Sequence, residues 1–373
     1  MSSDPRVVWR LMLAVNAVVL IGVFLSKIRL PPYSPYIHLL VDYHFGFVKR
    51  ALIGALTGLF VAKVPVWTVF AIGGTAWLVT AGLFVHLFRR TFTLSDDQRP
   101  MFVFMAGSPF FLKNFMHTLG HFDIYGCLFT IGLLLAPARS PLFVLLAALA
   151  SVVLVLIHHV QLLEYVPTIA VIVMLRHYLV VGITRPNLAI GIGALVGLGA
   201  LFVAVQFYGT MPIPEAEFIQ YLQGRMADPA RTEFLGFSFI WYQSLAMEFH
   251  DTWERLPWNL LGFPVYAVLL WLHAPLWQYF AAMIGALADV RQRQLVIAAI
   301  TAVSLGYLVI FATVFDYSRW LSNWVVCLFL IMHAVKHLPS AQALPPIAAG
   351  DQRTRVFGWL ITLIPRVGIV RPF

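Results

Sequence analysis

Residues 142–164 read LFVLLAALASVVLVLIHHVQLLE, and stretches of this kind decide the fold. The stretch is apolar as far as Ile157 and then carries two histidines, a glutamine and a glutamate. An apolar helix of about 20 residues crosses a hydrocarbon core about 30 Å thick, and shorter helices lie against other helices. The pattern therefore predicts a membrane span at 142–158 and a polar hinge, after which the next span covers 161–181.

The composition of the whole chain agrees with this pattern. Of its 373 residues, 61% are hydrophobic and 11% are charged, and the mean hydropathy is +0.85. Soluble domains carry about 25% charged residues, so this chain needs lipid around it. Lipid offers the backbone no hydrogen bonds, which leaves helices and closed barrels. The apolar runs do not alternate as the strands of a membrane barrel do, and helices are therefore predicted.

About ten spans are expected. They cover residues 7–27, 66–88, 101–115, 122–137, 142–158, 161–181, 188–208, 258–288, 295–315 and 321–337. The long span 258–288 contains Pro275, and proline interrupts a helix. The predicted fold class is all-α, a polytopic transmembrane helix bundle with interfacial helices on its outer face.

The segments that join the spans indicate the orientation of the chain. Short segments that carry arginine, such as 89–99 and 291–293, come at alternate turns. Because basic residues collect on the cytoplasmic side, we predict that these turns and both termini are cytoplasmic, in the inner (plasma) membrane of a bacterium. The net charge of +9 is scattered in the same way between apolar helices. No nucleic-acid partner is predicted, because no basic stripe or arm is present.

The expected domain organisation is simple. A transmembrane domain covers 1–337, and a cytoplasmic tail with an interfacial amphipathic helix covers 338–373. Two segments on the outer face, 28–65 and 209–257, are long enough to form short interfacial helices.

Segment 44–65 is apolar, but Lys49 and Arg50 interrupt its start. If it crossed the membrane, Arg89 and Arg90 would lie outside. We therefore interpret it as an interfacial or re-entrant helix on the outer face.

With this topology, charged and imidazole side chains collect on the outer face, at the ends of apolar helices. Such groups are costly to bury there, and their collection on one side predicts a functional site. The candidates are Asp42, His44, His117, His121, Asp123, His158, His159, Glu164, Asp316 and Arg319.

Asp42 lies in the first outer segment, two residues before His44. A carboxylate that reaches a substrate hydroxyl can act as a general base, which makes Asp42 and His44 candidate catalytic residues. The structural alternative is an ion pair between Asp42 and Lys49 or Arg50.

His117, His121 and Asp123 lie between two short spans. The two histidines are four residues apart and would share a face if the segment were helical. Together with Asp123 they could bind a divalent metal, form a hydrogen-bonded loop, or make a charged patch for phosphate. A divalent metal is the one cofactor that the sequence leaves open, and no metal ligand is assigned.

His158, His159 and Glu164 surround the hinge between two spans. Polar groups beside apolar helix ends are functional candidates. The structural alternative is a buried ion pair between Glu164 and Arg319 or Lys113.

Asp316 and Arg319 occupy the tight outer turn before the last span. The planar guanidinium group of arginine suits phosphate, and Asp316 would orient or neutralise it. A structural Asp–Arg turn is the alternative.

These features resemble the type-C glycosyltransferase superfamily, whose members have many spans and an Asp in a first outer loop with short helices. The resemblance implies an enzyme that moves a sugar from a polyprenyl-phosphate carrier to a hydroxyl of a glycan or lipid acceptor on the non-cytoplasmic face. It implies Asp42 as the base. It also implies that the lipid phosphate or the sugar is held by Arg319, His158, His159, His117, His121 and Asp123.

Residues 46–54 and 316–320 also resemble segments of uncharacterised bacterial polytopic proteins of polysaccharide biosynthesis. Three other functions compete. One is a non-enzymatic membrane subunit, which would leave the outer-face cluster without a purpose. A polysaccharide polymerase or ligase of the O-antigen type would use the same lipid carriers to join oligosaccharides. A transporter of lipids or solutes would show polar residues at mid-span and a repeat of the fold. Membrane lipid is a partner in every case.

Overall fold

The computed structural model describes residues 4–29, 33–140, 142–342 and 344–368, and in these ranges every regular element is a helix. An isolated parallel bridge joins Val64 and Met226. The predicted all-α fold is confirmed. The predicted bounds 28–65, 1–337 and 338–373 include residues that lie outside the described ranges, namely 1–3, 30–32, 141, 343 and 369–373.

Six helices in the described ranges are long and apolar enough to cross a membrane. They are α1 (Pro5–Arg29), α4 (Trp67–Thr91), the segment Gln161–Val181, α12 (Arg185–Tyr208), α18 (Val290–Thr313) and α19 (Tyr317–Lys336). The segment Gln161–Val181 consists of α9 (Gln161–Glu164), α10 (Val166–Val173), η2 (Met174–Tyr178) and α11 (Leu179–Val181). A protein with several such helices is a multi-pass membrane protein.

The other four predicted spans are short or interrupted, so the described residues hold fewer membrane-length helices than the ten expected. Two of them form the shorter apolar helices α7 (Asp123–Leu135) and α8 (Leu142–Ile157). A third is divided into α5 (Arg99–Ala106) and α6 (Leu112–His117). Pro109 lies in the gap between them and cannot donate a helical hydrogen bond.

The fourth is the span for which the sequence predicted a break at Pro275, and that break is confirmed. It comprises α15 (Leu256–Leu260), α16 (Phe263–Leu272) and α17 (Ala274–Gly285), and the chain bends by 61° where α16 gives way to α17. At the bend, His273 Nε2 lies 2.9 Å from Ser108 Oγ, which is in the gap between α5 and α6. The other ring nitrogen of His273 bonds the carbonyl of Leu269 at 2.8 Å. Buried polar groups need partners, and here the two interrupted helices provide them for each other.

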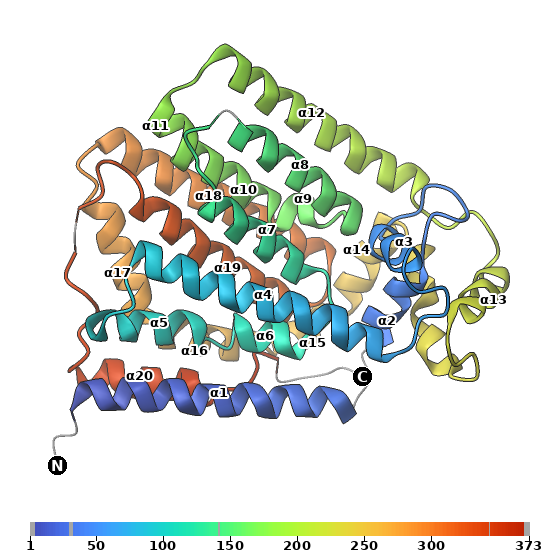
Figure 1. The fold of residues 1–373 in the computed structure, drawn as a ribbon, viewed down its shortest axis with the longest axis horizontal. Helices are drawn as coiled ribbons and strands as arrows, with labels where there is room; N and C mark the ends of the chain where they lie inside the picture. Colours follow the sequence, from blue (N-terminus) through green and yellow to red (C-terminus); the bar gives the residue numbers. More distant parts are fainter. Residues whose placement is uncertain (1–3, 30–32, 141, 343, 369–373) are drawn as a thin grey trace.

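The helices lie roughly along the long axis of the molecule, as Figure 1 shows. α19 is at the centre, since 83% of the residues in its 18-residue apolar stretch are buried. In the corresponding stretch of α12 only 11% are buried. The outer helices present large apolar side chains such as Leu195, Val196 and Leu308 to the surroundings. Exposed apolar area on this scale requires lipid rather than water.

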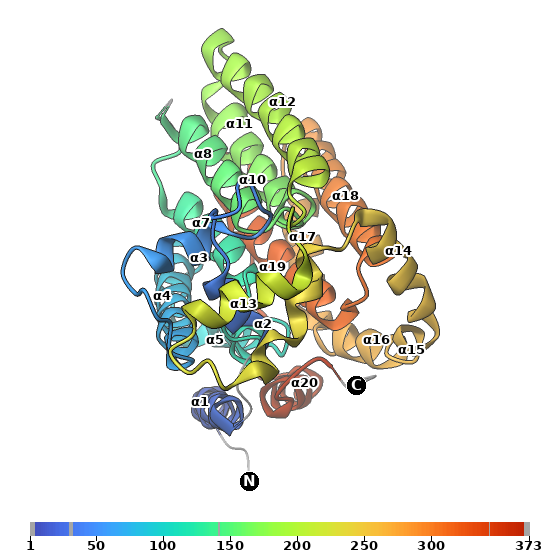
Figure 2. The same ribbon diagram turned by 90° about the vertical axis from the view of Figure 1, so that its right-hand side faces the viewer.

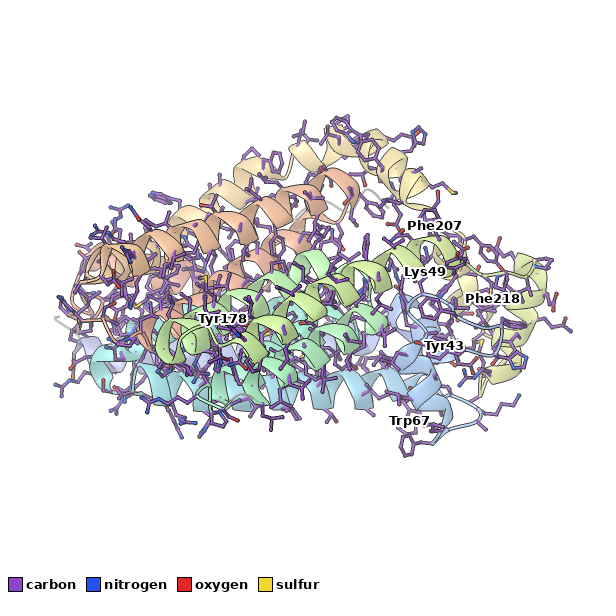
Figure 3. The ribbon with its side chains drawn as sticks, turned by 90° about the horizontal axis from the view of Figure 1, so that it is seen from above. Tyr43, Lys49, Trp67, Tyr178, Phe207 and Phe218 are labelled. Atoms are coloured by element: carbon purple, nitrogen blue, oxygen red, sulfur yellow. The ribbon has the colours of Figure 1, made fainter. Side chains whose placement is uncertain are left out.

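A small cap covers one end of the bundle. It comprises residues 33–66 and 209–242, with α2 (Tyr33–Leu40), α3 (Leu52–Gly58), α13 (Glu215–Arg225) and η3 (Thr232–Trp241). These elements lie together on the right of Figure 1 and face the viewer in Figure 2. In Figure 3, Tyr43, Lys49 and Phe218 lie at this end, where α12 finishes near Phe207, whereas Tyr178 lies toward the opposite end.

The two predicted outer segments build the cap jointly. Trp241 Nε1 of the second segment donates to the carbonyl of Lys49 in the first at 2.8 Å, and within the first segment the hydroxyl of Tyr36 donates to the carbonyl of Val64 at 2.6 Å. A shared hydrophobic core includes Leu40, Phe218 and Trp241. α3 has only seven residues, which reach about 10 Å at 1.5 Å per residue. It lies beside α2 at one end and does not cross the bundle.

The tail forms α20 (Gln352–Leu363), which packs against α1, α5 and α16. Figure 2 shows α1 and α20 side by side, seen end-on. Trp9 is fully buried beneath the tail, and its Nε1 donates to the carbonyl of Ala349 at 3.1 Å. Lys113 Nζ donates to the carbonyls of Ile361 and Thr362, at 2.9 and 2.6 Å, at the end of α20. The helix that the sequence placed at a membrane surface is thus packed onto the bundle.

Candidate functional site

Three of the predicted segments meet beneath the cap, and each supplies its polar side chain from a helix end. Asp123 is the first residue of α7, Glu164 is the last residue of α9, and Arg319 lies in the first turn of α19. Arg319 Nε is 2.7 Å from Asp123 Oδ2, and Arg319 Nη1 is 3.5 Å from Asp316 Oδ2. The carboxylate of Asp123 also lies where the helix dipole of α7 favours an anion.

Glu164 belongs to the same group. The residue is 1% exposed, its carboxyl experiences the charges of Asp123 and Arg319, and the amide of Asn323 adjoins both carboxyls. The hydroxyl of Tyr165 donates to Asn323 Oδ1 at 3.1 Å and holds that amide in place. Glu164 Oε1 has no hydrogen-bond partner among the described residues. Of the two structural alternatives from the sequence, the structure places Glu164 by Arg319, because Lys113 binds α20.

His158 and His159 follow α8 directly, and their rings stack with centroids 5.4 Å apart. His158 Nδ1 accepts a hydrogen bond from the backbone N–H of Val160 at 3.2 Å. The pKa of His159 lies well below its ordinary value, chiefly because of burial and then because of the charges of Arg50 and Lys49. The ring of His159 is therefore neutral, and its Nδ1 has no partner in the part of the chain described.

His117 and His121 do not share a helix face. α6 ends at His117, and the chain then turns through Gly120, whose φ is +88°, before α7 begins. A side chain on Gly120 would collide with Val69 and Pro35. Burial and the charge of Arg319 hold the pKa of His121 well below its ordinary value.

Among the side chains that the structure describes, no three His, Cys, Asp or Glu residues gather as metal ligands.

Asp42 and His44 lie in the cap, in a different environment. Asp42 forms an ion pair with Arg225 of α13 and accepts the hydroxyl of Tyr221 at 2.8 Å. The ring of His44 stacks on Tyr221 with centroids 4.8 Å apart. Neither Lys49 nor Arg50 is the partner of Asp42: Lys49 Nζ donates to the carbonyl of Gln243, and Arg50 faces Glu248.

Sequence reasoning missed two residues of the site. Arg50 acts electrostatically on Arg319, Asp123 and all three neighbouring histidines, His38, His158 and His159. Its own pKa is lowered, first by burial. His38 lies between the rings of Phe122 and Trp241, and burial lowers its pKa to about 3. The sequence feature that could have revealed Arg50 is the basic pair that interrupts an apolar segment, because burying a charge is costly unless the charge is paired.

These residues together are called the Arg50–Arg319 cluster below. Its members are Arg50, Arg319, Asp123, Glu164, His38, His121, His158 and His159.

An apolar pocket of about 200 Å³ is lined by residues that do not belong to the cluster. Tyr317, between Asp316 and Arg319 in the chain, is one of its walls. The others are Thr252, Trp253, Leu256, Phe311 and Ala312. Tyr317 lies two residues before Arg319 in α19, and this is the link along the chain between the pocket and the cluster.

No protein-family model, curated protein or solved structure matches this chain. What the site can do is therefore argued from its chemistry. Guanidinium groups bind phosphate through planar pairs of donors, a buried carboxyl can take a proton from a hydroxyl, and the pocket suits a lipid chain.

Proposed function

We propose that the chain is a membrane glycosyltransferase that moves a sugar from a polyprenyl-phosphate carrier to a hydroxyl of a glycan or lipid acceptor. The observation that carries the proposal is the combination of a buried arginine and a buried carboxyl at one end of a membrane bundle, with an apolar pocket whose wall Tyr317 lies two residues from that arginine in the chain. A prenyl phosphate presents the matching groups, an anion joined to an apolar chain. Arg319 holds the phosphate, and the pocket takes the first part of the lipid.

The reaction is a displacement at the anomeric carbon of the sugar. The acceptor hydroxyl gives its proton to a carboxylate as its oxygen forms the new bond to that carbon. The bond between the carbon and the phosphate oxygen breaks, and the electron pair stays on the phosphate. A positioned base and a cation beside the departing anion are the two groups that this step needs, and the proposal gives these roles to a buried carboxylate and to Arg319.

Glu164 is the better placed of the two candidate bases. The oxygens of Asp42 are occupied by Arg225 and Tyr221, and Asp123 Oδ2 lies 2.7 Å from Arg319 Nε. Glu164 Oε1 is unpaired and lies in the same cluster as Arg319. In this proposal Asp42 holds the cap together, although the family resemblance gives it the role of base.

The proposal includes a location. α5 with α6, α7, α8 and the bent pair α16–α17 lie alongside the six long helices in Figure 1, and counting them as crossings gives ten. An even number puts both ends of the ten-span domain on the arginine-rich face, which would be the cytoplasm of a bacterium. The cap and the Arg50–Arg319 cluster would then face away from the cytoplasm, where prenyl-linked sugars are the donors.

The test is sugar transfer by the purified chain in lipid vesicles. The vesicles contain a panel of polyprenyl-monophosphate sugars and extracted envelope glycolipids as acceptors, and the release of polyprenyl phosphate is measured by chromatography. Glu164→Gln is expected to lower the rate by about 10²–10⁴-fold, the usual contribution of a general base. Glu233→Gln, at an exposed glutamate of the cap, is the matched control and should keep the full rate.

Asp42→Asn decides between the two bases. If it abolishes release in a folded variant while Glu164→Gln does not, Asp42 is the base. Release from a prenyl-diphosphate oligosaccharide alone would instead favour a polymerase or ligase. Movement of the intact donor across the vesicle without cleavage would refute the transferase and favour a transporter.

A further inference from the structure

Arg50 has an unusual backbone conformation. Its φ is +61°, in the left-handed region that favours glycine, and within the described ranges only Thr93 shares this among residues other than glycine. Both backbone polar groups of the neighbouring Lys49 form hydrogen bonds to other parts of the cap. Its N–H donates to the carbonyl of Gly209 at 2.8 Å, and its carbonyl accepts Trp241 Nε1. Strain of this kind persists where the surrounding fold imposes it, and it gathers at functional sites.

The side chain of Arg50 is buried without a strong partner. It is 12% exposed, its Nε has no hydrogen-bond partner in the described structure, and its ion pair with Glu248 is long, at 3.9 Å. The charge of a second cation, Arg319, also acts on it. Two buried guanidinium groups repel each other, and Arg319 already has a carboxylate at 2.7 Å. An anion between the two would relieve the repulsion and complete the hydrogen bonds of Arg50.

We propose that Arg50 binds the phosphate of the lipid carrier and meets the second negative charge that appears on it when the sugar departs. This inference rests on the proposed function. A sugar–phosphate–prenyl donor is a phosphodiester with one negative charge. Once the bond to the sugar breaks, the carrier is a phosphate monoester that carries close to two charges above pH 7. Arg319 neutralises the charge of the donor, and Arg50 neutralises the charge that develops, which is how a cation accelerates the step.

A purely structural role for Arg50 predicts something different. In that case its guanidinium group would only tie the first cap segment to Glu248 in α14 (Leu245–Glu254). Arg50→Gly separates the two possibilities, because glycine adopts φ +61° without strain and the backbone path is kept. The variant should fold as well as the parent chain while lacking the guanidinium group.

The experiment measures the binding of two probes by the purified full chain in detergent at pH 8. One probe is farnesyl phosphate, a dianion, and the other is its methyl ester, a monoanion, and tryptophan fluorescence reports binding. The parent chain is expected to prefer the dianion by about tenfold or more, the worth of one charged hydrogen bond. Arg50→Gly and Arg50→Gln should bring the ratio close to one, and Arg50→Lys should restore part of it.

Arg231→Gln, at an exposed arginine of the cap, is the matched control and should keep the full preference. If Arg50→Gly melts at the parent temperature or above and still prefers the dianion, the inference is wrong. The two proposals fail separately. Sugar transfer at the parental rate in Arg50→Gly would overturn the role of Arg50 and keep the transferase. A preference for the dianion that Arg50→Gly abolishes, in a chain that transfers no sugar, would keep the anion site and overturn the transferase.

Discussion

Replacing Arg319 by methionine removes the ion-pair partner of Asp123, a carboxylate of the site that is almost fully buried. Arg319 touches two acids, but they differ in exposure: the side chain of Asp123 is 1% exposed and that of Asp316 is 41% exposed. The contact with Asp316, at 3.5 Å and open to solvent, is worth at most about 1 kcal/mol. Breaking a buried pair leaves an uncompensated charge and typically costs about 3–5 kcal/mol. Arg319→Met should therefore lower the free energy of unfolding by about that amount.

In a chain of this size, each kcal/mol moves the melting temperature by about 2 °C. We therefore expect Arg319→Met to melt about 6–10 °C below the parent. Unfolding of both chains is monitored by tryptophan fluorescence in the same detergent. Asp123→Asn in the same chain removes the stranded charge, so the double variant should recover most of the loss and lie within about 1–2 kcal/mol of the parent. A double variant that melts as low as Arg319→Met would show that the two side chains are not coupled, and it would refute this account of the site.

Three further predictions concern stability. Burial lowers the pKa of His38 to about 3, below its unfolded value, so stability is lost as the pH falls from about 6.5 toward 3. His38→Gln should remove up to about 1.4 kcal/mol per pH unit of that loss, seen in melting temperature against pH. Gly120→Ala adds a side chain at φ +88° against Val69 and should destabilise by about 2–4 kcal/mol. Gly74→Ala, with open space around it, is its control and should not destabilise. Lys113→Met should leave two carbonyls of α20 unpaired and speed hydrogen exchange over residues 352–363.

Much of the helical framework could be predicted from hydropathy. The predicted span 142–158 corresponds to α8 at Leu142–Ile157, and 66–88 to α4 at Trp67–Thr91. The interruption between α5 and α6 was not predicted, although Pro109 lies within it. The mean hydropathy of a segment does not reveal that one residue lacks a backbone N–H. A helix loses a hydrogen bond at that residue and is interrupted there.

The site could be predicted only in part, because hydropathy indicates at which end of the bundle a residue lies and not which residues are its neighbours there. The segments around Asp123, Glu164 and Arg319 lie at the ends of helices that pack on one another, and they meet. Asp42 lies at the same end but pairs with Arg225, which is 183 positions away in the chain. The packing of α2 against α13 determines that choice, and no local pattern shows it. Arg50 is placed by a backbone angle that the sequence does not reveal.

The packing of α20 on α1 also sets an order of assembly. Trp9 and Ala349, which bond each other, are 340 positions apart. Until residues 352–363 have left the ribosome, Trp9 lacks its cover and the ammonium group of Lys113 lacks the carbonyls that hold it. The growing bundle therefore stays open along one flank until α20 has been synthesised, and the docking of α20 closes it. A quality-control factor that tests for the exposed flank would recognise a chain cut short before α20 as unfinished.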